Sequence, residues 1–229
     1  MVCQGADHDF NYGFYQLVVD LIPSGSRILN LGSGIVFNFE RLLSEQKKVY
    51  ISSCDIVPPA NKPCFINDFI VQSVEEEIKF NKGGFDVVTF FELIEHIDKT
   101  DVLLRNCHTL LKDDGRLIFS FPNLASVYAR VELLLGFQPH ILEVSNERSD
   151  LGTGFFGRLN CSWGTVPLHH IRGITYKAMR GQLSYHGFFA ERIVGFSSRF
   201  WKIFKLCPSL APVVLMVCRK KSYARKSNS

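Results

Sequence analysis

The stretch Arg27-Ile28-Leu29-Asn30-Leu31-Gly32-Ser33-Gly34 decides the fold, because an apolar run leads directly into a tight glycine turn. The run predicts a buried β-strand, and the glycines let a ligand approach the backbone closely since they carry no Cβ. Asp55 ends a second apolar run about 20 residues later, at the distance where an acidic side chain holds a ribose diol. This order of elements predicts a nucleoside-binding α/β domain.

The residue at position 37 argues against a dinucleotide cofactor. The dinucleotide motif has a further glycine three residues after Gly34, and Phe37 occupies that position. A bulky side chain there keeps the next helix from packing close to the strand, where its N-terminus would bind a pyrophosphate. A ligand with a ribose and no phosphate fits better, and S-adenosylmethionine is the common one.

The rest of the chain alternates strand and helix patterns, which is typical of a parallel sheet with helices on both faces. Helices are expected over residues 12–22, 36–45 and 100–112, with a weaker pattern over 73–80. The expected strands are apolar runs bounded by turn signals, and they lie at 27–31, 49–54, 63–66, 85–91, 116–121, 189–196 and 212–218.

A long segment follows the strand expected at 116–121. It contains a helical piece at 124–135 and a glycine-rich polar run at 150–164, before Thr175 caps the next helix. Long segments with little regular structure are usually functional, and this one emerges at the carboxyl ends of the strands, where α/β sheets bind ligands. We therefore expect residues 124–174 to form a substrate-recognition lid that is mobile without ligand.

Length and composition fit one domain over residues 1–229, with a flexible basic tail at 221–229. The net charge of +4 is too mild to indicate a nucleic-acid partner. The seven cysteines include no Cys-x-x-Cys pair, and their odd number favours a reducing cytoplasmic location. No apolar run approaches the ~20 residues that span a bilayer, so no transmembrane segment is expected.

The chain resembles the class I S-adenosylmethionine-dependent methyltransferases over roughly residues 10–220, through the glycine turn, Asp55 and a strand that ends in Glu92-Leu93-Ile94-Glu95-His96. It looks closest to a bacterial branch with Glu-x-x-Glu-His that acts on small molecules and glycan precursors. The resemblance implies a Rossmann-like seven-stranded sheet, a lid insertion after the fifth strand, and S-adenosylmethionine as cofactor. Two positions depart from the family pattern: Asn30 replaces the usual acid and Val36 the usual third glycine.

Cofactor contacts are expected at the ends of the first four strands. Asp55 should accept hydrogen bonds from the ribose hydroxyls, Asp68 from the adenine amino group, and Phe90 and Phe91 should line the pocket. The complete expected set of cofactor-binding residues is Asn30, Gly32, Ser33, Gly34, Asp55, Ile56, Asn67, Asp68, Phe90 and Phe91.

The chemistry is expected at the end of the fourth strand. Methyl transfer from a sulfonium is an in-line displacement, so the protein mainly positions the acceptor and removes a hydroxyl proton. Glu92, Glu95 and His96 have i, i+3, i+4 spacing, which places them on one side of a helical turn. His169 and His170 could fold back over the same place. The expected catalytic residues are His96, His170 and Glu95, with an imidazole as general base.

The same residues leave two other interpretations open. Two carboxylates and two imidazoles could hold a divalent metal, or they could simply cap the turn. In plant-type small-RNA 2′-O-methyltransferases, residues at positions similar to Glu92, Glu95, His96 and His170 bind magnesium. Our prediction is an O-methyltransferase that acts on a small-molecule or glycan-precursor hydroxyl without metal. The alternatives are a magnesium-dependent RNA 2′-O-methyltransferase and, because of the two departures from the family pattern, a non-catalytic cofactor-binding member.

Overall fold

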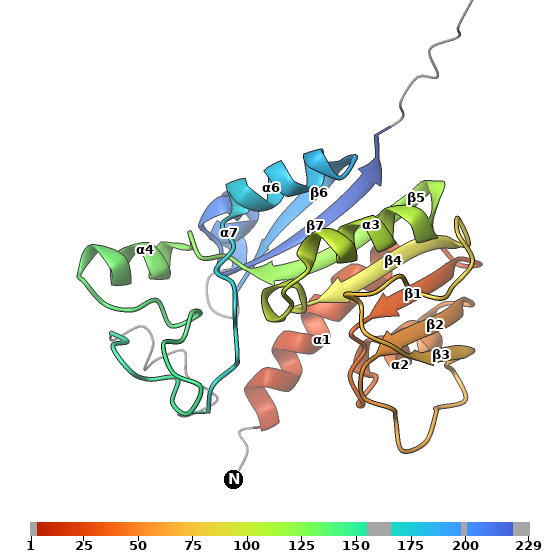
Figure 1. The fold of residues 1–229 in the computed structure, drawn as a ribbon, viewed down its shortest axis with the longest axis horizontal. Helices are drawn as coiled ribbons and strands as arrows, with labels where there is room; N and C mark the ends of the chain where they lie inside the picture. The colour runs from red at the N-terminus through yellow and green to blue at the C-terminus, as the bar shows by residue number, and fades with distance from the viewer. Residues whose placement is uncertain (1–3, 155–165, 198–200, 222–229) are drawn as a thin grey trace, which may run out of the picture.

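A seven-stranded sheet forms the centre of the molecule in the computed structural model, which describes residues 4–154, 166–197 and 201–221 (Figure 1). In chain order the strands are β1 (Arg27–Leu31), β2 (Tyr50–Asp55), β3 (Asp68–Val71), β4 (Phe85–Phe91), β5 (Leu111–Pro122), β6 (Phe188–Phe196) and β7 (Val213–Lys220). Their spatial order is β3-β2-β1-β4-β5-β7-β6, and β7 runs antiparallel between β5 and β6. The predicted Rossmann-like fold class is confirmed.

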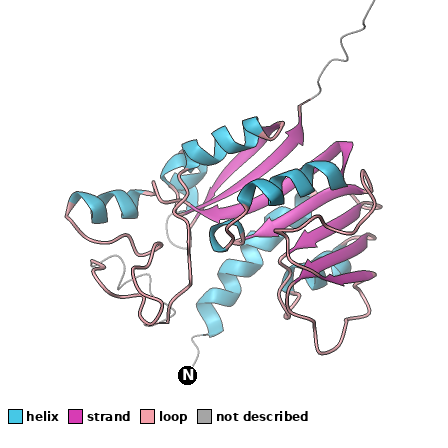
Figure 2. Cartoon of the chain, in the orientation of Figure 1, coloured by secondary structure: helices cyan, strands magenta, loops and turns pink. Residues whose placement is uncertain are grey.

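Helices cover both faces of the sheet (Figure 2). They are α1 (Gln4–Leu21), α2 (Asn38–Gln46), α3 (Thr100–Leu110), α4 (Val127–Leu134), α6 (Tyr176–Tyr185) and α7 (Trp201–Leu206), with short 3₁₀ turns η1 (Ile94–His96) and η2 (Pro208–Leu210). One part of the core packs the sheet against α3 and α6, and the other packs it against α1 and α2. Burial on both faces explains why the central strands β1 and β4 are largely apolar without a strict alternation of polar and apolar residues. Among the described residues, no helix combines the length and apolarity needed to cross a membrane.

The third strand begins later than the sequence predicts. Residues 63–66 form a turn closed by the Ile66 N–H, which donates to the Pro63 carbonyl at 3.0 Å, and β3 starts only at Asp68. The predicted helix at 73–80 is also wrong. The Gln72 side chain bonds the backbone of Glu77 and Lys79 instead, so the segment folds as turns around this amide.

The predicted insertion leaves the sheet after β5 and returns at α6. Its two ends meet in an isolated bridge between Asn123 and Ile174, and the Leu124 N–H donates to the Ile174 carbonyl at 2.9 Å. In Figure 1 the insertion extends beyond the carboxyl ends of β1 and β4, with α4 at its outer edge. Residues 155–165, which hold much of the glycine-rich run, and residues 222–229 of the expected tail lie outside the described part of the chain.

Candidate active site

The glycine turn after β1 carries the geometry that a closely bound ligand requires. Gly32 and Gly34 have φ values of 67° and 65°, in the left-handed region that favours glycine. A Cβ on Gly32 would lie 2.8 Å from the Leu93 side chain, whereas the corresponding position on Gly34 faces open space. Ser33 lies between them, and its hydroxyl donates to the Gly34 carbonyl at 3.3 Å. The outer side of the turn is therefore accessible to a ligand.

Asp55 ends β2 beside this turn. The Gly34 N–H donates to one oxygen of its carboxylate at 2.8 Å, and the Val57 N–H donates to the other at 2.9 Å. A carboxylate offers about four lone pairs, so two acceptor sites remain for a pair of ribose hydroxyls. Ile56 follows directly and is 68% exposed, which leaves an apolar surface next to the carboxylate. These residues fit a nucleoside that carries a free ribose.

Asn30 does not face this turn, contrary to the sequence prediction. It is 3% exposed, and its amide donates to Glu40 Oε1 at 2.7 Å while it accepts from the Thr89 hydroxyl at 2.8 Å. Glu40 lies on α2, is 1% exposed, and also accepts from Ser53 at 3.3 Å. Burial raises the pKa of the Glu40 carboxyl. Asn30 therefore ties β1 to α2 and β4 beneath the turn, and its side chain is engaged within the protein rather than presented to a ligand.

Asn67 and Asp68, both predicted to bind the cofactor and Asp68 to contact the adenine, lie at the end of β3 opposite the ligand-binding edge. Asp68 begins the strand and pairs with Ser52, whereas Val71 pairs with Asp55 at the ligand-binding edge. Three residues of strand correspond to about 10 Å. The Asp68 carboxylate accepts from the Tyr50 hydroxyl at 3.0 Å, and the Asn67 side chain accepts from the Ile51 N–H at 2.8 Å. Both side chains hold β3 against β2.

The two aromatic residues at the end of β4 belong to the core. Phe90 is completely buried, and its ring stacks on Phe119 with 4.6 Å between centroids, so the prediction that it lines the pocket is wrong. Phe91 points to the other face of the sheet. It packs edge-on against Phe39 at 5.0 Å and Phe14 at 5.5 Å, between the strands and helices α1 and α2.

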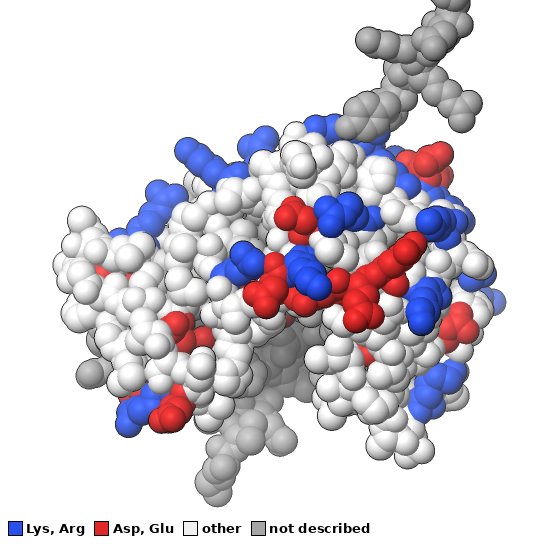
Figure 3. Space-filling model, in the orientation of Figure 1, with Lys and Arg blue, Asp and Glu red and all other residues white. Residues whose placement is uncertain are grey.

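Glu92 follows β4 with φ 45°, an uncommon backbone conformation for a residue other than glycine. Such strain tends to occur at functional sites, where the surrounding fold imposes it. Its carboxylate accepts from the Ser120 hydroxyl at 2.6 Å, and burial raises its pKa to about 7. The Glu92 residue is itself open to solvent. Figure 3 shows this face of the molecule hollowed between the insertion and the β2–β3 end of the sheet.

Glu95 is the most unusual charged residue of the site. It lies in η1, is completely buried, and neither carboxylate oxygen has a hydrogen-bond partner. Burial and the nearby Glu92 carboxylate raise its pKa well above the usual range for a glutamate. A buried carboxyl group without a partner is costly, so its presence needs a functional explanation.

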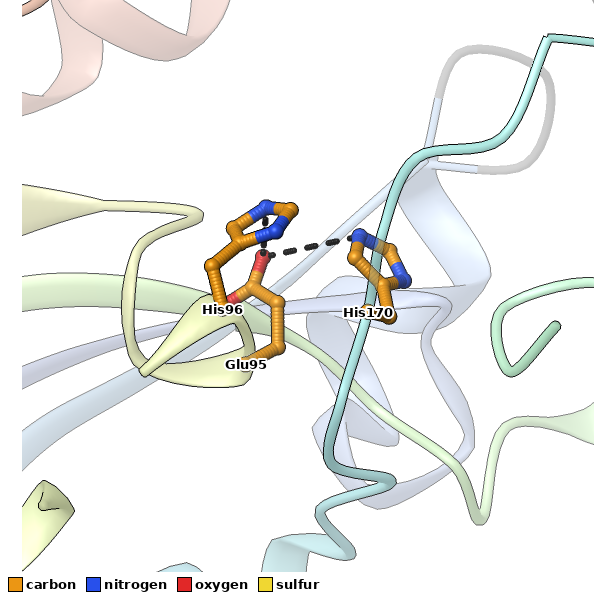
Figure 4. A group of neighbouring side chains, drawn as sticks. All are labelled: Glu95, His96 and His170. Carbon is orange, nitrogen blue, oxygen red and sulfur yellow. Dashed lines mark ion pairs between the residues drawn. The ribbon is translucent and has the colours of Figure 1, made fainter. Parts of the chain in front are cut away.

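Two imidazoles face the Glu95 carboxyl (Figure 4). Nε2 of His96 lies 3.8 Å from Oε1 of Glu95, and Nε2 of His170 lies 3.9 Å from the same oxygen. Each ring has its Nδ1 against a backbone carbonyl: His96 at 3.2 Å from His169 and His170 at 2.7 Å from Ile141. Because a carbonyl only accepts, both rings carry the proton on Nδ1, and each Nε2 presents a lone pair to Glu95.

The insertion is hydrogen-bonded directly to η1. The N–H groups of Ile171 and Arg172 donate to the Glu95 carbonyl at 3.0 and 3.2 Å, and the Arg172 guanidinium donates to the Ile97 carbonyl at 3.0 Å. These bonds bring His170 to the carboxyl end of β4, as the sequence predicts. Burial and the neighbouring His170 lower the pKa of His96, which keeps this imidazole neutral near pH 7.

Three of the four predicted metal-ligating residues form one compact group. The ligand atoms of Glu95, His96 and His170 lie within 4.8 Å of one another, whereas Glu92 bonds Ser120 outside this group. Nδ1–H groups bonded to carbonyls are typical of metal-binding histidines, so the group fits a divalent cation. Imidazole nitrogens favour transition metals, whereas magnesium prefers oxygen ligands. This ligand set is therefore poorer for magnesium than the resemblance to small-RNA 2′-O-methyltransferases implies.

The chain belongs to the methyltransferase domain family, whose model matches residues 10–163. It is 32% identical over 114 residues to a ubiquinone biosynthesis O-methyltransferase from Xanthomonas axonopodis; the match covers 45% of this chain and 46% of that relative, so the chain spans under half of its length.

Two solved structures share the fold. An S-adenosylmethionine-dependent methyltransferase from Mesorhizobium loti superimposes with a TM-score of 0.60 at 16% identity, over 94% of this chain and 100% of that one. A 1,6-didemethyltoxoflavin-N1-methyltransferase from Burkholderia thailandensis, solved with S-adenosylhomocysteine, has a TM-score of 0.57 at 13% identity, over 96% and 80%.

Proposed function

We propose that the protein is an O-methyltransferase that acts on the hydroxyl group of a small molecule or glycan precursor. The observation that carries this proposal is the buried Glu95 carboxyl with two imidazole lone pairs directed at it, at the end of β4. An O-methyltransferase needs a base for the hydroxyl proton, and an unprotonated Nε2 is one. The similarity to ubiquinone biosynthesis O-methyltransferases supports a small-molecule hydroxyl as acceptor.

Each part of the site has a role in this proposal. S-adenosylmethionine supplies an electrophilic methyl group on its sulfonium. Asp55 and the glycine turn hold the ribose and fix the direction from which that methyl group is presented. His96 or His170 accepts the proton of the acceptor hydroxyl on Nε2, next to the Glu95 carboxyl oxygen that both rings face.

A second candidate is methyl transfer assisted by a divalent cation. It is favoured by the unpartnered oxygens of Glu95, which an ion bound by the two Nε2 atoms would satisfy. Such an ion would lower the pKa of the acceptor hydroxyl and would replace an imidazole as the agent that removes its proton.

The acceptor class can be tested by labelled methyl transfer. The protein is incubated with S-adenosylmethionine labelled on its methyl group and with a cell extract, and the label is followed into small-molecule and RNA fractions. We expect label in a small-molecule fraction as an ether that survives mild base. Label in nuclease-sensitive RNA would support the RNA methyltransferase instead, and absence of label from every fraction would support the non-catalytic alternative. An Asp55→Ala variant is the control for transfer that does not depend on this site.

A further inference from the structure

The carboxylate of Glu143 connects two segments of the insertion beside the site, one that contains Glu143 and one that contains His170. Glu143 accepts hydrogen bonds from the backbone N–H groups of Leu168, through Oε1, and of His170, through Oε2 at 3.1 Å. These residues are 25 and 27 positions away in the sequence, so the carboxylate connects segments that the chain alone does not hold together. Hydrogen bonds to an ionised acceptor are about twice as strong as those between neutral groups.

His169 lies between the two N–H donors, and its backbone conformation allows both to reach the Glu143 carboxylate. His169 has φ 60°, in the left-handed region, which turns the two flanking N–H groups toward one anion. The same conformation presents the His169 carbonyl to Nδ1 of His96 at 3.2 Å. A single strained residue therefore links the Glu143 carboxylate on one side to the His96 ring on the other.

The segment that carries Glu143 also orients the ring of His170. The Ile141 carbonyl accepts from Nδ1–H of His170 at 2.7 Å, so Ile141 selects the ring tautomer and Glu143 holds the backbone of the same residue. The result is an Nε2 lone pair 3.9 Å from Oε1 of Glu95. Without the carboxylate, two N–H groups lose their acceptor and the left-handed turn at His169 loses its support.

We propose that Glu143 is a positioning residue, which keeps His170 at Glu95 in the tautomer with a free Nε2. The inference rests on the proposed role of His170 in methyl transfer, and it assigns a function to this part of the insertion: it carries and orients one of the two imidazoles. Both hydrogen bonds of the Glu143 carboxylate come from backbone N–H groups, of Leu168 and of His170, rather than from the ring nitrogens of the site.

The test compares Glu143→Gln with Glu147→Gln, a matched change at an exposed glutamate of the same segment. A glutamine in place of Glu143 would offer one acceptor to two donors, and its NH₂ group would face the other donor. In Glu143→Gln we expect turnover to fall about 10- to 100-fold, with S-adenosylhomocysteine affinity in calorimetry unchanged. We also expect the ¹⁵N spectrum of His170 to change from the Nδ1–H tautomer to a mixture. Glu147→Gln should match the unmutated protein in all three measurements.

One further variant separates a positioning role for Glu143 from a general loss of folding. Glu143→Asp keeps both oxygens on a shorter side chain and should restore the Nδ1–H tautomer in part, which distinguishes positioning from a general loss of folding. A His170 spectrum in Glu143→Gln that remains that of the Nδ1–H tautomer would overturn the proposal, as would turnover equal to that of Glu147→Gln. If the unmutated protein transfers no methyl group, the spectrum still tests Glu143, and only the proposed function fails.

Discussion

Replacing Glu95 with glutamine is predicted to stabilise the protein at neutral pH. The Glu95 carboxyl is completely buried without a hydrogen-bond partner, and burial together with Glu92 raises its pKa to about 9. A glutamate in an unfolded chain has a pKa of about 4.3. At pH 7 the Glu95 carboxyl is therefore protonated in the folded protein and ionised in the unfolded chain. This difference lowers the free energy of unfolding by about 3 to 4 kcal/mol.

The pH dependence follows from the direction of this shift. The protonated Glu95 carboxyl contributes its full stability below about pH 4.3, and this contribution is lost as the pH rises toward the pKa of the folded protein. Glutamine has no proton to lose, and its amide N–H groups can donate to the Nε2 lone pairs of His96 and His170. The stability advantage of Glu95→Gln should thus grow by about 1.4 kcal/mol per pH unit between pH 5 and pH 8.

Urea unfolding at pH 5, 6, 7 and 8, with chelator present to exclude bound cations, measures this difference. Glu147→Gln, at an exposed position of the insertion, controls for loss of a carboxylate and should show no growing advantage. The measured quantity is the stability advantage of Glu95→Gln over the unmutated protein at each pH. An advantage that is no larger at pH 8 than at pH 5 would refute the reasoning. That result would mean that Glu95 is ionised and compensated in the folded protein.

Three further outcomes are expected. Asp55→Ala should weaken S-adenosylmethionine binding in calorimetry by roughly 2 to 3 kcal/mol, because it removes a charged acceptor; unchanged affinity would exclude the ribose contact. His96→Ala and His170→Ala should reduce turnover, by about 10²- to 10⁴-fold for the true base, with cofactor affinity retained; normal turnover in both variants would make these residues structural. Exhaustive chelation should leave turnover unchanged under the base mechanism, whereas a loss that added manganese or magnesium restores would favour the cation.

Features fixed by short-range sequence signals could be predicted. The glycine turn, Asp55 at the end of β2 and the turn after β4 follow from local patterns and from the rule that parallel strands end at one edge. Thr175 also caps α6 as predicted, since its hydroxyl accepts from the Ala178 N–H at 3.2 Å.

Features that depend on strand orientation could not be predicted. Phe90 and Phe91 lie in a strand buried on both faces, where no polar alternation shows which ring points in which direction. The sequence places a strand at 63–66, so that Asp68 would follow its carboxyl end. The turn after Pro63 delays β3, and Asp68 instead begins the strand, at the end opposite the ligand-binding edge.

Two carboxylates of the structure were missed because their partners are far away in the sequence. Glu40 lies among the buried apolar residues of α2. An acidic residue on the apolar face of a predicted helix is the local signal that could have revealed it. Glu143 lies in a segment without periodicity, and its partner His170 is 27 positions away, so no spacing rule reaches it.

The central claim is that the carboxyl edge of the sheet holds the cofactor by Asp55 and directs its reactive end to Glu95, His96 and His170. A crystal structure of the protein with S-adenosylhomocysteine tests this most directly. The account predicts both ribose hydroxyls within hydrogen-bond distance of the Asp55 carboxylate, about 2.7 Å, and the sulfur atom facing His96 and His170. A ribose bound away from Asp55, or a sulfur directed away from His96 and His170, would contradict the account.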